Sequence, residues 1–148
     1  MKAPFLIGRI LFGGFFLYNG INHFKNRGQM AQYAASKGVP QADVAVAATG
    51  ALLVFGGASI ITGILPKLGT AAIAVFLGGV SPVMHDFWQV EDEGERMNQM
   101  IHFSKNTALL GADLALMGIP EPWSMSLPVS QPSRMERVKK FARRSMAA

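Results

Sequence analysis

The stretch VAVAATGALLVFGGASIITGIL, residues 44–65, contains no charged side chain and decides the fold class. About 20 apolar residues in a helix cross the roughly 30 Å hydrocarbon core of a bilayer. Outward from this stretch, three more segments are similarly long and apolar, so the predicted spans are residues 5–24, 44–65, 68–88 and 101–119. Only 16% of the residues are charged, against about 25% in a soluble domain. The sequence therefore predicts an all-α integral membrane protein, an antiparallel four-helix bundle, and excludes a soluble globule or a disordered chain.

The predicted membrane domain covers residues 1–119, and the remaining segments have different compositions. Residues 29–37 contain helix formers followed by Gly38 and Pro40, which predicts a short helix on the outer surface. Residues 120–133 are rich in proline and are predicted to be a linker, in which Trp123 suits the membrane interface. The acidic run 91–95 is predicted to be a solvated turn.

Lysine and arginine residues set the predicted orientation, because cytoplasmic loops carry an excess of them. One side of the predicted bundle carries eight and the other five. We therefore expect both termini and the turn at 66–67 to be cytoplasmic, with the longer connections outside. Residues 134–148 form a basic tail, predicted either as an amphipathic helix on anionic lipid or as a disordered segment. No nucleic-acid-binding module accompanies these charges, so nucleic acid is not an expected partner.

Two opposite charges fall within the predicted spans. Arg9 lies about 6 Å from the inner edge of the first span and Asp113 about 9 Å from that of the fourth. Ionisable groups inside a membrane usually face the bundle interior with a partner. We therefore expect a buried Arg9–Asp113 ion pair, which either fixes helix pairing or takes part in a proton or ion relay.

Polar side chains also gather at the predicted outer ends of the spans. The three histidines, His23, His85 and His102, each lie near the outer end of a different span, so helix packing brings them to one depth. A neutral histidine with amide or ammonium donors nearby can bind a carbonyl oxygen and exchange protons near neutral pH. This pattern favours a quinone-type headgroup site. The predicted pocket comprises His23, His85, His102, Asn19, Asn22, Asp86, Trp88, Lys105 and Asn106.

Other interpretations of the histidines remain open. Three histidines suit a metal ion by residue type, and two can ligate a haem. Their spacing supports neither, since each comes from a different region, and no metal site is predicted. Polar groups that only cap helix ends are the structural alternative. The absence of cysteine excludes disulfides and thiolate catalysis.

Several motifs resemble those of the DoxX family in the same order. They are Gly8–Phe12 (GRILF), Asn19–Phe24 (NGINHF), Ala34–Pro40 (AASKGVP), His85–Trp88 (HDFW) and Lys105–Ala112 (KNTALLGA). The resemblance covers about residues 5–119 and leaves out the tail. It implies a small four-helix protein of the inner membrane of bacteria or archaea, linked to membrane redox complexes or redox stress, with function inferred by analogy alone.

The sequence leaves three functions open. The first is a subunit or accessory of a quinone-linked redox system, with a partner supplying the redox centre. The second is a non-enzymatic scaffold that recruits soluble redox or detoxifying enzymes through the basic tail. A small transporter is the weakest, because the first span offers Arg9 in place of the acidic residue that four-helix exporters use. Whether the chain is itself an enzyme stays open.

Overall fold

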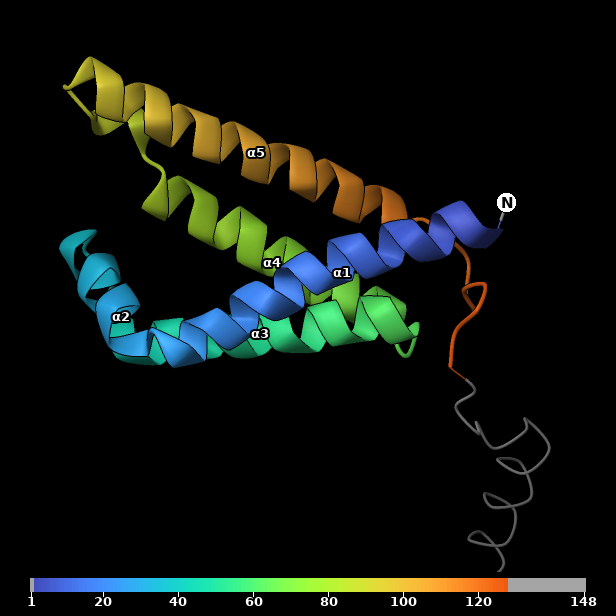
Figure 1. The fold of residues 1–148 in the computed structure, drawn as a ribbon. Helices are drawn as coiled ribbons and strands as arrows, with labels where there is room; N and C mark the ends of the chain where they lie inside the picture. The colour runs from blue at the N-terminus through green and yellow to red at the C-terminus, as the bar shows by residue number, and fades with distance from the viewer. Residues whose placement is uncertain (1, 128–148) are drawn as a thin grey trace, which may run out of the picture.

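The computed structural model describes residues 2–127, and every regular element in this range is a helix. The long helices are α1 (Lys2–Lys25), α3 (Ala42–Thr62), α4 (Pro66–Met84) and α5 (Glu93–Met117) (Figure 1). A shorter helix, α2 (Arg27–Ser36), joins α1 to α3, and the 3₁₀ helix η1 (Phe87–Gln89) joins α4 to α5. The predictions for residues 128–133 of the linker and for the basic tail, 134–148, lie outside the described residues.

Within residues 2–127, three segments are long and apolar enough to cross a membrane: Ala3–Lys25, Ala42–Thr62 and Pro66–Gln89. They contain the first three predicted spans almost entirely. The predicted short helix at 29–37 is present as α2. The fourth predicted span lies mostly within α5, which extends well beyond it at a polar N-terminal end.

The start of α5 corrects the interpretation of the acidic run as a turn. Asp92 caps the helix, and its carboxylate accepts a hydrogen bond from the backbone nitrogen of Glu95 at 2.8 Å. Glu93 and Glu95 then occupy the first turn. Negative charge at a helix N-terminus is favourable because it faces the positive end of the helix dipole. The acidic residues therefore begin a helix here.

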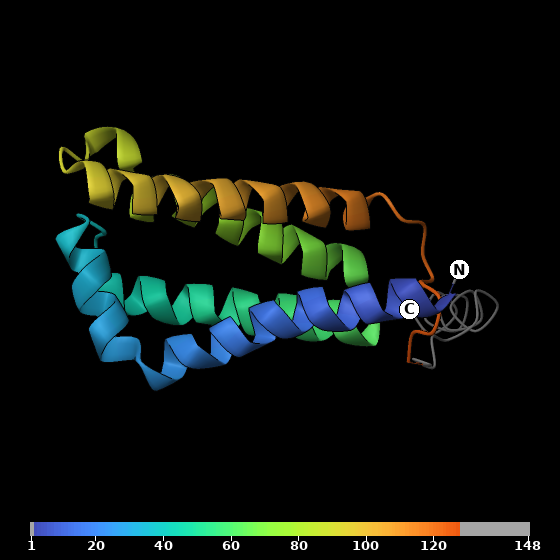
Figure 2. The same ribbon diagram turned by 45° about the horizontal axis from the view of Figure 1, so that its top comes forward.

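The four long helices lie side by side (Figure 2). α1 packs on α3, α3 on α4, and α4 on α5, while α2 packs mainly on α3. The start of α1 and residues 118–127 lie at one end of the molecule, here called the terminal end. α2 and η1 lie at the opposite end, here called the α2 end.

Glycines allow α1 and α3 to approach closely. A Cβ atom added at Gly13 would lie 2.7 Å from the carbonyl oxygen of Gly57, and one at Gly57 would lie 2.5 Å from that of Gly13. Both distances are too short for a side chain, so glycine is required at this crossing. Close backbone approach through small residues is how helices associate where lipid supplies no hydrophobic drive.

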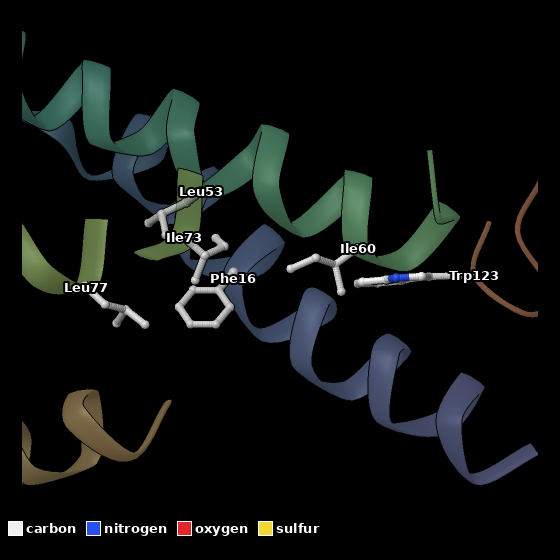
Figure 3. Packing of buried hydrophobic residues seen from close by; sticks show 6 residues of the cluster. All are labelled: Phe16, Leu53, Ile60, Ile73, Leu77 and Trp123. Carbon is white, nitrogen blue, oxygen red and sulfur yellow. The ribbon is translucent and has the colours of Figure 1, made fainter. Parts of the chain in front are cut away.

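The core is a cluster of apolar side chains shared by these helices and the C-terminal segment. It contains Phe16, Leu53, Ile60, Ile73, Leu77 and Trp123 (Figure 3). Trp123 is 3% exposed and lies beside the end of α3, so it belongs to this core. Residues 118–127, here called the strap, fold back over the terminal end, and the backbone nitrogen of Leu127 donates to the Thr62 carbonyl at 2.9 Å. This part of the predicted linker is packed against the helices.

Candidate functional site

A pocket of about 630 Å³ lies at the α2 end, between α1, α2, α3 and α4. Its apolar lining comes from α2, α3 and α4 and from the connection between α2 and α3, and comprises Met30, Ala34, Val39, Ala45, Val46, Phe76, Gly79, Val80, Val83 and Met84. Its polar lining comprises Asn22, His23, Asn26, Gln29, Tyr33, Thr49 and His85. A mostly apolar wall with a few polar groups is typical of a small-molecule site, and the volume lies within the usual range of about 300–1,000 Å³.

His23 enters the pocket wall from the last turns of α1. Its Nδ1 donates to the backbone carbonyl of Asn19, one turn earlier, at 2.8 Å. The ring makes a T-shaped contact with Phe76 of α4, with 6.0 Å between ring centroids. Gly50 of α3 lies against the same side chain, since a Cβ there would come within 2.9 Å of the His23 Cβ. Three helices therefore position this ring.

His85 follows directly after α4 and also lines the pocket. Its Nδ1 donates to Oε1 of Gln99 on α5 at 2.8 Å. Its ring stacks on that of His102, with centroids 5.1 Å apart and planes inclined by 16°. Lys105 donates from Nζ to Nδ1 of His102 at 3.3 Å. Two residues of α5 that do not line the pocket, Gln99 and His102, therefore hold His85 in place.

The structure places only some of the nine predicted site residues in the lining of the pocket. Asn22, His23 and His85 line the pocket, and Asn19 holds His23 through its backbone carbonyl. His102 and Lys105 adjoin the site through the stacked ring of His85, and the lining that the structure describes does not include them.

Trp88, Asn106 and Asp86 are likewise absent from the lining formed by residues 2–127. Trp88 packs with Phe87 and Phe103 in an aromatic cluster whose centroids are 5.1–5.7 Å apart.

Asp86 pairs with Lys37, the C-cap residue directly after α2, at 2.6 Å. Both side chains are 20% exposed. This hydrogen bond raises the pKa of Lys37, and the ion pair ties the end of α2 to the end of α4 beside the pocket. Sequence reasoning missed Lys37 as a site residue, although it stands in a motif that resembles the DoxX family.

Sequence reasoning also missed the contribution of α2, which supplies Gln29, Met30, Tyr33 and Ala34 to the lining. A short surface helix gives no sign in its sequence that it covers a cavity. Gln99 was missed for a similar reason, because one glutamine in a polar helical turn has no distinguishing pattern.

The predicted Arg9–Asp113 ion pair is wrong. Arg9 is fully buried and donates to the backbone carbonyls of Ile60 at 3.0 Å, Ile61 at 2.8 Å and Ser124 at 2.7 Å. Its guanidinium also lies over the rings of Phe5 and Trp123, 5.6 and 5.4 Å from their centroids. Asp113 is fully buried on α5, and neither carboxylate oxygen has a hydrogen-bond partner among the described residues.

The packing order of the helices explains why these charges stay apart. α5 packs on α4, whereas Arg9 on α1 lies against the end of α3 and the strap. Matching depth and sign, from which the pair was predicted, do not specify which helices are neighbours.

Within residues 2–127, no three His, Asp or Glu side chains are grouped so that they could hold a metal ion. The histidines are arranged as a pocket residue on α1 and a stacked pair between α4 and α5.

In the part of the chain that the structure describes, the fold is all-helical and three apolar helices have membrane-spanning length, which defines a multi-pass membrane protein. The chain belongs to the DoxX family, whose model matches residues 5–86. This match covers α1 to α4 and ends at Asp86, within the motif that carries His85. No curated protein and no solved structure matches the chain.

Proposed function

We propose that the chain crosses the inner membrane of a bacterium or archaeon four times as an antiparallel bundle, with α5 as the fourth span. Residues 101–117 of α5 are mostly apolar and lie along α4. Large apolar side chains are exposed on the long helices, among them Leu11, Val75 and Leu114, which suits contact with lipid. The excess of lysine and arginine favours a cytoplasmic terminal end.

We propose further that the pocket at the α2 end binds the headgroup of a quinone-type molecule. The observation that carries this proposal is that His23 of α1 and His85 at the end of α4 line one largely apolar cavity. Apolar side chains suit a flat ring and the start of a lipid tail, and the histidines and amides suit its oxygen atoms. A lipid-soluble ligand is favoured because so little of the lining is polar.

In this proposal the chain is a subunit or accessory of a quinone-linked redox system. The sequence contains no cysteine, so thiolate redox chemistry has to come from a partner subunit or a soluble enzyme. The role of this chain is to hold the quinone at the membrane.

Binding of decylubiquinone to the protein in lipid nanodiscs tests the proposal. The reduced form, decylubiquinol, is measured as well, and we expect His23→Ala and His85→Ala each to weaken its binding at least about tenfold, or about 1.4 kcal/mol. His102→Ala should have a smaller effect, because its ring reaches the pocket through His85. Trp88→Ala is the matched control, since Trp88 is 53% exposed and its contacts lie in the aromatic cluster.

The alternative function is a scaffold that recruits soluble redox or detoxifying enzymes. The sequence supports it, because a strongly basic stretch, residues 134–148, follows the strap along the chain. Such a tail suits both anionic lipid and an acidic partner. Quinone binding that is undetectable, or unchanged in both histidine variants with folding intact, would overturn the pocket proposal and favour the scaffold.

A further inference from the structure

We propose that the pocket selects the reduced, dihydroxy form of its ring ligand over the oxidised, dicarbonyl form. This inference rests on the proposed function and concerns which form of the ligand the site prefers. It follows from the hydrogen bonds that fix the two pocket histidines from behind.

The proton on His23 is placed by a backbone carbonyl. The Asn19 oxygen can only accept, so Nδ1 of His23, at 2.8 Å, carries the hydrogen. A neutral imidazole has one donor and one acceptor nitrogen. Nε2, the nitrogen that His23 has left for a ligand, is therefore an acceptor.

His85 is fixed in the same way by a different helix. Gln99 presents Oε1 to Nδ1 at 2.8 Å, so Nδ1 again donates and Nε2 is left as an acceptor. Asp86, the next residue in the chain, is already paired with Lys37.

Thr49 adds a third acceptor to the lining. Its hydroxyl donates to the Ala45 carbonyl at 2.8 Å, which leaves the oxygen lone pairs for a ligand. The remaining polar lining does not discriminate, because Asn22, Asn26, Gln29 and Tyr33 side chains can each both donate and accept. A dihydroxy ring has two O–H donors and can therefore satisfy two of the three acceptors. A ligand with carbonyl groups leaves them unpaired, and unpaired polar groups cost binding free energy.

The test compares decylubiquinol with decylubiquinone under anaerobic conditions, with the protein in lipid nanodiscs and empty nanodiscs subtracted. We expect the quinol to bind at least about tenfold more tightly. Gln99→Leu, which frees Nδ1 of His85, should reduce this preference severalfold. Asn98→Leu, an exposed neighbour on the same turn, should leave it unchanged.

A second measurement keeps the inference testable if a variant does not fold. Nitrogen-15 spectra of the histidine-labelled wild type should show His23 and His85 with a protonated Nδ1 and an unprotonated Nε2. Equal affinity for both forms, tighter binding of the quinone, or a protonated Nε2 on both rings would overturn the inference while leaving the pocket proposal standing. Binding of neither form would overturn the proposed function and this inference with it.

Discussion

At the scale of single residues, Arg9 is held by the end of a neighbouring helix. It donates to Ile60 and Ile61 in the last turn of α3 and to Ser124 in the strap. The last carbonyls of a helix have no intrahelical donor, and they carry the negative end of the helix dipole. The buried guanidinium of Arg9 therefore links α1 to the end of α3 and to the strap. It also lies against two aromatic rings.

Replacing Arg9 should therefore be costly without involving Asp113. We expect Arg9→Met to lower the free energy of unfolding in detergent by at least about 3 kcal/mol, because hydrogen bonds to charged groups are worth about 1.5–3 kcal/mol each. Arg27→Met is the control. Arg27 forms an exposed ion pair with Asp43, so its loss should cost less than about 1 kcal/mol. Recovery of stability by exchanging Arg9 and Asp113 would contradict this account, since it would indicate a direct pair.

For Asp113 we expect substitution to have the opposite effect on stability. A buried carboxyl group without a hydrogen-bond partner opposes folding. Asp113→Asn keeps the shape and removes the acidic group, so the melting temperature should stay the same or rise. A loss of more than about 1 kcal/mol, the usual size of a lost hydrogen bond, would reveal a partner that holds the carboxyl group.

At the scale of elements, the crossing of α1 and α3 depends on two facing glycines. Gly57→Ala should destabilise the protein by about 1–3 kcal/mol, the usual cost of overpacking. Gly14→Ala is its control, because nothing lies within 4 Å of a Cβ there and alanine is the better helix former by up to about 1 kcal/mol. Chemical unfolding of both variants measures the contrast. Equal effects would show that the close approach is absent.

Among the elements, the apolar helices could be predicted from the sequence and the strap could not. Apolar length alone predicted α1, α3 and α4, because a membrane span needs a long uncharged run. The strap was not predicted, since a proline-rich segment carries no signal for the carbonyl of Ser124 that Arg9 binds. Backbone acceptors are the same in every residue, so a partner of this kind cannot be identified from side-chain chemistry.

At the scale of the whole molecule, the proposed orientation can be tested because the chain has no cysteine of its own. Ser36 in α2 and Ser124 in the strap are exposed and lie toward opposite ends. In intact cells, a membrane-impermeant maleimide should label Ser36→Cys directly and Ser124→Cys only after permeabilisation. Labelling of both from outside, or of Ser124→Cys alone, would contradict the proposed topology.

The site was predictable from the sequence in part, again for a physical reason. Equal depth in the membrane placed the three histidines at one end, but depth does not specify which side of a helix faces a cavity. His23 and His85 line the pocket, whereas His102 stacks behind His85. The wall from α2 depends on how the chain reverses after Lys25, which a pattern of apolar residues does not determine.

Photolabelling tests the central claim, that the pocket binds a quinone-type ring, most directly. A photoreactive azidoquinone is added to the protein in lipid nanodiscs and the labelled residues are mapped by mass spectrometry. The account predicts label on residues 22–34 and 76–85, and its loss when excess unlabelled quinone competes. Label confined to outward-facing residues such as Leu11, Val75 and Leu114, or label that excess quinone does not reduce, would contradict it.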